Sequence, residues 1–324
     1  MDNPENISLS PGIQPEDSLA EAGKKVWRYQ LAEMLSHEEG TRSGEDIEAL
    51  HDMRVATRRM RAAFDVFGEA FKPKALAPHL KGLRATGRTL GKVRDLDVLL
   101  DKAATYLQTL APDEQHGLDP LIESWQVQRE AARLEMLDFL DGEVYTRFRE
   151  MFSDFLDPQK VKHGSRTVGD LEPFRVKELA PVLIYQHLAA VRAYDSVLDT
   201  ATLAQLHQLR IQFKRFRYTV EYFQEVLNPE GQKVIEDLKH IQDHLGDLND
   251  ANVAVILLKG FFKEFSAKQD RLPAYQRQNS SGVMMYLTYR YNELHQSILA
   301  FPETWKWFNR PTLSRNLALA IAGL

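Results

Sequence analysis

The amino-acid sequence contains no cysteine, which excludes disulfide bonds, thiolate metal sites and cysteine nucleophiles. It has no uncharged apolar run that approaches the roughly 20 residues needed to cross a bilayer. Its first residues, MDNPENISLS, are acidic and polar, whereas a signal peptide is basic and then apolar. These absences predict a soluble, cytoplasmic protein. The formal net charge of −5 over 324 residues also argues against a protein that coats nucleic acid over its whole surface.

The periodicity of the apolar residues is helical, and no stretch of useful length alternates as a strand would. With 44% apolar residues, the chain can bury one large core or two ordinary ones. In the N-terminal half, helices are expected over about 19–40, 46–71, 76–90, 94 onwards, 120–140 and 144–156. Near the other end, 286–299 predicts a further helix, and 313–324 is an apolar segment that could pack on the body or on a second subunit.

One pattern is written twice, as LHDMRVATRRMRAAFDVF at 50–67 and as LHQLRIQFKRFRYTVEYF at 206–223. At about 100° per residue on an α-helix, the basic residues of each copy fall within one narrow arc, beside an apolar flank. We call these arcs the first basic stripe (His51, Arg54, Arg58 and Arg61) and the second basic stripe (His207, Arg210, Lys214 and Arg217).

Another pattern recurs in the same order, since LGKVRDLDVLL at 90–100 is echoed by LGDLNDANVAVILL at 245–258. The spacings between copies are 156 and 155 residues, which indicates an internal duplication. The predicted fold is all-α, with two four-helix bundles related by a pseudo-twofold axis, plus extra helices. The predicted divisions are a flexible N-terminal tail (1–17), a first helical repeat (18–157, the first half), a linker (158–173), a second helical repeat (174–310, the second half) and a C-terminal segment (311–324).

The two basic stripes favour anion binding, because guanidinium groups one turn apart present a row of donors to successive phosphate oxygens. The stripes are nearly free of acidic partners, and none lies between His207 and Val220. The alternative is that these cations line a solvated face or pair with acidic residues of neighbouring helices. The occurrence of the stripe at matching positions in both halves favours the first interpretation.

The helix after the first stripe extends the pattern with Lys81, Arg84, Arg88 and Lys92 on one face. At the aligned positions the second half keeps only Lys239 as a cation. We therefore expect the first half to contribute more positive charge to any binding surface than the second half.

The histidines that open the stripes, His51 and His207, have two possible roles. Each could donate to phosphate and gain a charge near pH 6.5, or each could bond a carbonyl at the centre of a bundle. A histidine that accepts a phosphoryl group is not favoured, since no glycine-rich nucleotide loop or acidic metal-binding cluster accompanies it.

Two further groups of residues have competing interpretations. His240, His244 and Asp247 share one helix face at a spacing that could hold a divalent metal, but HExxH is absent, and a surface or capping role is favoured. Asp95 and Asp250, each just after a glycine, could cap the fourth helix of their half or orient a stripe arginine, and capping is favoured. No catalytic residue, metal site or cofactor is predicted.

Together these patterns resemble the CHAD family, the "conserved histidine α-helical domain". The resemblance rests on HDMRVATRRMRAAF and LGKVRDLDVLL with their second-half versions, and it covers about residues 18–310. It implies two pseudo-symmetric four-helix units with a basic cavity or surface that binds inorganic polyphosphate, often at polyphosphate granules. Some relatives carry a triphosphate-processing domain with an ExExK signature, which is not found here. With Lys81 added from the periodicity, the predicted polyphosphate-binding residues are His51, Arg54, Arg58, Arg61, Lys81, Arg84, Arg88, His207, Arg210, Lys214, Arg217 and Lys239.

The leading hypothesis is therefore non-catalytic binding of polyphosphate or another linear polyanion, with granule-associated proteins as expected partners and no membrane. A phosphotransferase or phosphohydrolase that uses His51, His207 or a metal is the second hypothesis. A nucleic-acid-binding protein is the third, and the net negative charge and the lack of a groove-reading motif count against it. The sequence leaves the preferred chain length, the oligomeric state and the choice between pore and surface open.

Overall fold

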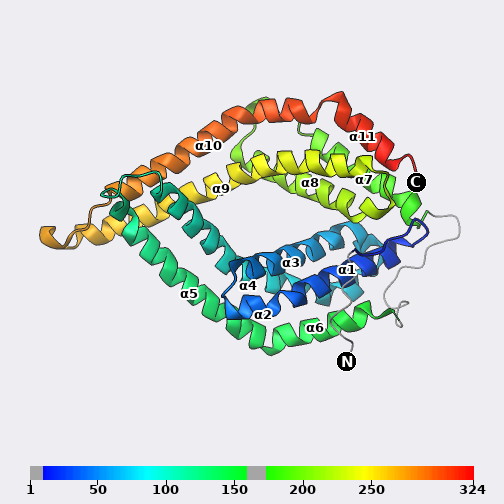
Figure 1. The fold of residues 1–324 in the computed structure, drawn as a ribbon, viewed down its shortest axis with the longest axis horizontal. Coiled ribbons are helices and arrows are strands. Elements are labelled where there is room, and N and C mark those ends of the chain that lie inside the picture. Colours follow the sequence, from blue (N-terminus) through cyan, green and yellow to red (C-terminus); the bar gives the residue numbers. More distant parts are fainter. Residues whose placement is uncertain (1–9, 159–172) are drawn as a thin grey trace. The chain divides into compact units, whose positions relative to one another are not determined.

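The computed structural model describes residues 10–158 and 173–324, and in these ranges the chain forms α-helices joined by loops and 3-10 turns, without a strand (Figure 1). The all-α class predicted from the sequence is confirmed. No helix among the described residues combines the length and the apolar character that crossing a membrane requires. The helices are α1 (Leu19–Ser36), α2 (Glu38–Ser43), α3 (Ile47–Phe67), α4 (Pro73–Leu107), α5 (Asp119–Asp141), α6 (Glu143–Leu156), α7 (Val176–Arg192), α8 (Leu203–Tyr222), α9 (Glu230–Asp270), α10 (Ser281–Phe308) and α11 (Pro311–Ile321).

The expected break at Gly91 is wrong, because α4 continues through this glycine without interruption. α9 likewise runs through Gly246. One glycine inside a helix costs only about 1 kcal/mol, which the packing of a long helix easily offsets. Asp95 and Asp250 consequently lie inside helices, so the prediction that they cap a fourth helix is also wrong.

Side-chain caps fix the starts of the helices that carry the basic stripes. α3 begins after Asp46, whose carboxylate accepts a hydrogen bond from the N–H of Glu48. α8 begins after Thr202, which forms a reciprocal capping box with Gln205. Each cap satisfies N–H groups that have no partner within the helix, and such caps typically stabilise a helix by about 1 kcal/mol.

The described part of the predicted N-terminal tail, residues 10–17, is tied to the folded chain. The N–H groups of Gly12 and Ile13 donate to the carboxylate of Glu225 at 3.0 and 2.6 Å, and the Ile13 side chain is buried. Lys25 pairs with Asp17 at 2.7 Å. Nearly all of the predicted linker, 158–173, lies outside the described residues.

The described chain divides into two compact units. Unit 1 comprises Met1–Gly91, Glu135–His240 and Phe308–Leu324, and unit 2 comprises Lys92–Leu134 and Ile241–Trp307. Long helices contribute residues to both units, since α4 and α9 each span a boundary. Unit 1 contains both basic stripes.

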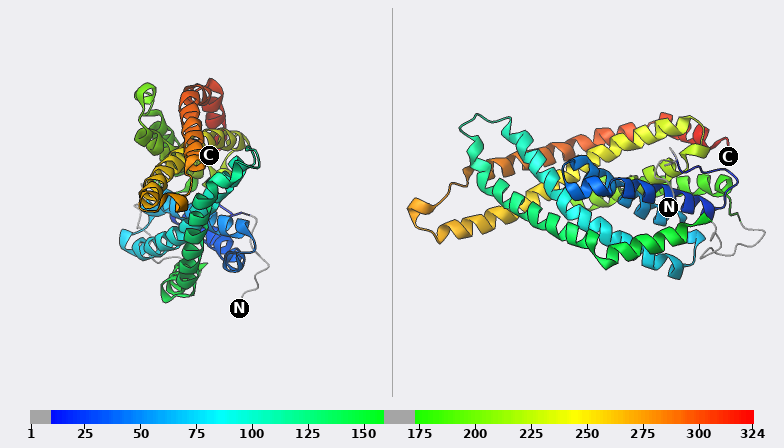
Figure 2. Two further views of the ribbon diagram at one scale, coloured as in Figure 1. Left: turned by 90° about the vertical axis from the view of Figure 1, so that its left-hand side faces the viewer. Right: turned by 60° about the horizontal axis from the view of Figure 1, so that its bottom comes forward.

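Trp27 of α1 is the centre of an aromatic core in unit 1. Its ring is fully buried and lies 4.5 Å from the ring of Phe64 and 5.3 Å from that of Phe71. Phe152 and Phe155 of α6 lie 6.4 and 6.3 Å from it. The indole N–H also donates to the carbonyl of Met60 at 3.1 Å, so Trp27 holds α1 against α3, which run side by side (Figures 1 and 2).

Contacts between equivalent elements of the two halves are symmetric within unit 1. Ser18 and Arg175, which directly precede α1 and α7, form an isolated antiparallel bridge. Phe67 and Phe223 occupy equivalent ends of the repeated pattern, and their rings meet edge to face at 5.6 Å. Residues that face their own counterparts in this way are expected near a twofold axis.

Two ion pairs between α3 and α8 repeat this relation. Arg59 lies 3.5 Å from Glu221, and its counterpart Arg215 lies 3.5 Å from Asp65. Arg59 corresponds to Arg215, and Asp65 corresponds to Glu221, at the repeat spacing of 156 residues. A twofold rotation that exchanges the two halves therefore also exchanges these two ion pairs. These contacts support the interpretation of the sequence as an internal duplication, while the division into two four-helix bundles stays a prediction.

The C-terminal helix α11 packs on the body of unit 1, which is one of the two arrangements expected from the sequence. Leu313 and Leu317 are buried. At its start Arg310 pairs with Asp237 at 2.7 Å, and near its end the side-chain amide of Asn228 donates to a carbonyl oxygen at 2.8 Å. Carbonyl groups at the end of a helix have no partner inside it, so this bond anchors the helix end.

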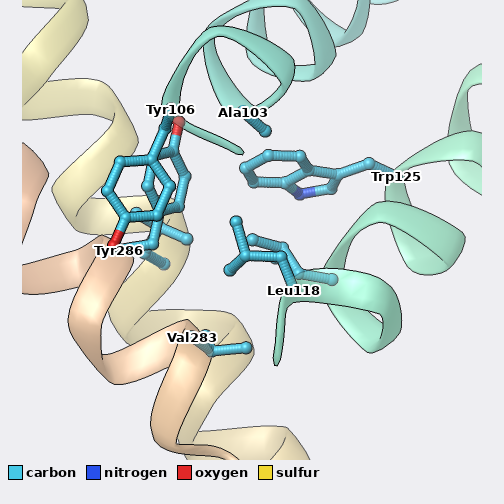
Figure 3. Close-up of a cluster of buried hydrophobic side chains, with 8 residues drawn as sticks. Ala103, Tyr106, Leu118, Trp125, Val283 and Tyr286 are labelled. Carbon is cyan, nitrogen blue, oxygen red and sulfur yellow. The ribbon is translucent and has the colours of Figure 1, made fainter. Parts of the chain in front are cut away.

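Unit 2 has its own core of buried aromatic and aliphatic side chains (Figure 3). Tyr106 and Tyr286 place their rings 4.8 Å apart, and the indole of Trp125 lies near Ala103. Burial raises the pKa of Tyr286 to about 12, since it disfavours the phenolate. These contacts join α4, α5 and α10 within this unit.

The buried His79 makes the stability of unit 1 sensitive to acid. Its ring lies against Phe152 and Phe155, and burial lowers its pKa below the usual value of 6.5. As the pH falls below 6.5, the unfolded chain binds a proton that the folded imidazole resists, so the free energy of unfolding decreases until the pH passes the lowered pKa. Above pH 6.5 this loss is absent.

We therefore expect the variant His79→Phe to lose less stability than the wild type when the pH is lowered from about 7.5 to 5. Urea unfolding at the two pH values measures this difference. His295→Phe, at an exposed position of unit 2, is the matched control and should retain the wild-type dependence. An identical loss in wild type and His79→Phe would contradict the assignment.

Candidate anion-binding site

A cavity of about 390 Å³ lies between α3 and α4 in unit 1. Five arginines from these two helices surround it. Three come from the first basic stripe and two from the extension of that stripe on α4. The complete lining is Arg54, Thr57, Arg58, Arg61, Leu83, Arg84, Gly87 and Arg88.

The helical period explains why these arginines converge. On α3, Arg54, Arg58 and Arg61 follow one another at intervals of four and three residues, so they share one face. On α4, Arg84 and Arg88 are four residues apart and face the same cavity. Two rows of guanidinium groups, one on each helix, therefore border the same cavity.

Small residues allow the two helices to approach beneath the arginines. A Cβ atom at Gly87 would lie 3.2 Å from Cγ2 of Thr57, so the helices meet closely at this point. A Cβ at Gly91, one turn further on, would lie 3.5 Å from Nε of Arg54. The backbone of α4 thus supports the Arg54 guanidinium at the wall of the cavity.

The cavity lining carries formal positive charge without an acidic residue. Among the described residues, Arg58, Arg61, Arg84 and Arg88 pair with no carboxylate. Nε of Arg58 is buried and has no hydrogen-bond partner in the described part of the chain. A buried donor without a hydrogen bond costs about 1–3 kcal/mol of stability, so this arrangement does not stabilise the fold.

The other predicted residues of the first half do not line this cavity. His51 is half-buried near the start of α3, and Lys81 is exposed on α4, one turn before Arg84. Both lie on the helices that border the cavity, so they extend its positive surroundings beyond the lining.

The second basic stripe lies on α8, also in unit 1, and it has a different environment. Arg210 and Lys214 are half-buried, His207 is exposed, and none of them lines the cavity. Arg217 has an acidic partner, Glu221, at 3.5 Å. The second stripe is therefore partly neutralised at its C-terminal end, which the sequence did not lead us to expect.

Lys239, the cation that the second half keeps from the α4 pattern, is exposed on α9 and does not line the cavity. Every arginine of the cavity belongs to the first half. This distribution agrees with the expectation that the first half contributes more positive charge.

The possible metal ligands on α9 are arranged differently from a metal site. Nε2 of His244 lies 2.9 Å from the carbonyl oxygen of Ser297, and the hydroxyl of Thr304 lies 2.9 Å from Nδ1. Both ring nitrogens of His244 are thus engaged by α10. In the residues that the structure describes, no group of three or more histidine, aspartate or glutamate side chains is placed to hold a metal ion.

Thr57, Leu83 and Gly87 line the cavity but were not predicted from the sequence. Their positions did carry a signal, because Thr57 lies between Arg54 and Arg58 on the same face, and Gly87 directly precedes Arg88. A search for small residues inside the basic pattern would have found Thr57 and Gly87. Nothing in the pattern shows that they meet, since the contact joins two helices.

The chain matches the CHAD domain family over residues 25–259, so this protein belongs to the CHAD family. The predicted family is confirmed. Two uncharacterised proteins of Mycobacterium tuberculosis, MT2285 of strain CDC 1551 and Rv2226 of strain H37Rv, are each 28% identical over 259 residues. The match covers 76% of this chain and 47% of each relative, so the chain spans about half the length of the curated relatives it matches.

Two solved structures share the fold. The crystal structure of the CHAD domain from the plant Ricinus communis has a TM-score of 0.70 at 21% identity, with 94% of this chain and 96% of that chain covered. PptA from Streptomyces chartreusis has a TM-score of 0.62 at 17% identity, with 90% and 100% covered. At these identities the likeness is one of fold.

Proposed function

We propose that this protein binds inorganic polyphosphate, or a similar linear polyanion, and that it does so without hydrolysing it. The observation that carries the proposal is the cavity lined by five arginines and no acidic residue. Guanidinium groups donate two parallel hydrogen bonds to phosphate oxygens and keep their charge at any physiological pH. Membership of the CHAD family adds support, since the resemblance implies this ligand.

The arrangement of the arginines suits a chain of phosphates better than a single small anion. Arg54, Arg58 and Arg61 repeat at one-turn intervals along α3, and a second row on α4 faces the same cavity. Successive phosphates of an extended polyanion can then contact successive arginines. The second basic stripe in the same unit is the proposed continuation of this surface, and polyphosphate granules are the proposed place of action.

Binding is favoured over catalysis by the chemistry of the lining. The cavity offers donors and positive charge, but no carboxylate, histidine or thiol lines it to act as a general base or nucleophile. Thr57 is the one hydroxyl in the lining, and it donates to the carbonyl of Met53 at 2.8 Å. The proposed role of the site is therefore to hold an anion.

A titration with polyphosphate at several salt concentrations tests the proposal. If about five phosphate contacts release counterions, the affinity should fall roughly a hundredfold between about 50 and 200 mM salt. Fluorescence anisotropy with labelled polyphosphate measures this slope. An affinity that does not change with salt, or the absence of binding at 50 mM, would contradict the proposed function.

Two controls separate the competing functions. Incubation of the protein with polyphosphate and Mg²⁺, followed by a phosphate assay, should show no release of phosphate above background, whereas turnover would establish an enzyme. Competition with DNA at fixed salt should leave polyphosphate bound. Displacement by an equal concentration of DNA phosphates would favour a nucleic-acid-binding protein.

A further inference from the structure

The two halves carry corresponding basic stripes, yet the arginine-lined cavity is bordered by the first half alone. The difference in charge between the two halves does not explain why the first half has a cavity, because arginine side chains can also lie flat on a surface without one. A cavity requires small side chains beneath the charged ones. Thr57 and Gly87 are the smallest residues of the lining.

Each of these two residues lies at the centre of its row of arginines. Thr57 has arginines three residues before it, one after it and four after it, and Gly87 has arginines three before it and one after it. On a helix these intervals surround a residue on one face. Since the Cγ2 atom of Thr57 lies 3.2 Å from the position of a Cβ at Gly87, the two small residues form the contact beneath both rows.

The second half has large residues at the aligned positions. Phe213 stands where the first half has Thr57, and Gln242 stands where it has Gly87. Phe213 is fully buried and meets the ring of Phe308 edge to face at 4.9 Å. The position that corresponds to Thr57 is therefore occupied by a phenyl ring that is part of a packed core.

We infer that Thr57 and Gly87 determine where the anion binds. Their small side chains leave space for a phosphate subsite in the first half, while Phe213 fills the corresponding place in the second half. This inference rests on the proposed function and adds to it. The first half binds phosphate groups within the cavity. The second basic stripe attracts the ligand electrostatically without enclosing a phosphate group. The residues that make the difference carry no charge.

The variant Thr57→Ser/Gly87→Leu tests the inference because it fills the cavity and keeps all five arginines. Serine retains the hydroxyl that donates to Met53 but lacks the methyl group that a side chain at 87 would meet. We expect its affinity for tripolyphosphate to fall about tenfold or more, as when one or two charge-assisted hydrogen bonds are lost. Ala77→Leu adds an isobutyl group at an exposed position of α4 and should bind as the wild type does.

The outcomes distinguish this inference from the proposed function. If the filled variant is folded by circular dichroism and binds tripolyphosphate as tightly as the wild type, the inference is overturned, while the proposed function still stands on wild-type binding. If the wild type itself does not bind, the proposed function fails.

A measurement on wild-type crystals keeps the inference testable even if the filled variant does not fold. Crystals soaked with tungstate, a tetrahedral oxyanion, should show anomalous density in the arginine-lined cavity, beside the contact of Thr57 with Gly87. No comparable density is expected beside Phe213. Equal density at both places, or density confined to the second basic stripe, would overturn the inference.

Discussion

Replacement of Arg58 and Arg84 by glutamate should lower the affinity for polyphosphate about a thousandfold, and so abolish binding under ordinary conditions. The two residues border the cavity from opposite helices, and neither has an acidic partner among the described residues. Each substitution removes charge-assisted hydrogen bonds, worth about 1.5–3 kcal/mol apiece, and places a negative charge against the phosphates. Fluorescence anisotropy with labelled polyphosphate measures the loss.

The matched control for this double variant is Arg147→Glu/Lys102→Glu. It makes the same change in net charge at two exposed positions that do not line the cavity. If general attraction between protein and ligand governs binding, both double variants should weaken it equally, and the cavity is then not the site. Circular dichroism and thermal unfolding show whether both variants keep the fold.

Replacement of Trp27 by alanine should destabilise the protein by about 3–5 kcal/mol, the usual cost of removing a buried aromatic side chain. The indole is fully buried among four phenylalanine rings and donates to the carbonyl of Met60. The variant leaves a hollow at the junction of α1, α3 and α6. Since domain stabilities are commonly about 5–15 kcal/mol, this loss is a large part of the total.

Urea unfolding of the wild type, Trp27→Ala and Trp27→Phe measures this effect. Phenylalanine keeps an aromatic ring but loses the N–H donor, so Trp27→Phe should lie between the other two. A loss below about 1 kcal/mol for Trp27→Ala would show that the neighbouring side chains close the hollow, contrary to the expectation. Because α1 holds α3, we also expect Trp27→Ala to weaken polyphosphate binding near its unfolding midpoint.

The helical class and the basic stripes followed from local sequence pattern, which explains why those predictions were reliable. Arg54, Arg58 and Arg61 share a face because the helical period sets the direction of each side chain, whatever surrounds the helix. The expected break at Gly91 failed for the complementary reason. A glycine lowers helix propensity by a small amount, and the contacts of the long helix α4, including the approach of Arg54 to Gly91, outweigh it.

The acidic partner of the second basic stripe was also only partly predictable from the sequence. From the sequence, no acid lies between His207 and Val220, so the stripe was expected to be unneutralised. Glu221 follows immediately, and it lies 3.5 Å from both Arg217 on its own helix and Arg59 on α3. The contact of Glu221 with Arg217 could have been predicted from their spacing of four residues on one helix. The contact with Arg59 depends on how α3 and α8 pack.

The sequence by itself determined that the chain is helical and that one basic pattern occurs twice, each time with a row of cations on one helix face, because these properties depend on the period and on the order of residues along the chain. Only the tertiary structure decided that one row borders a cavity whose lining contains no acidic residue. That outcome depends on the close approach of Thr57 and Gly87 on different helices, where a Cβ added at Gly87 would lie 3.2 Å from Cγ2 of Thr57. Phe213, by contrast, is packed against Phe308. Whether a space between helices stays open is set by the side chains that meet there, and such pairs are remote in the sequence.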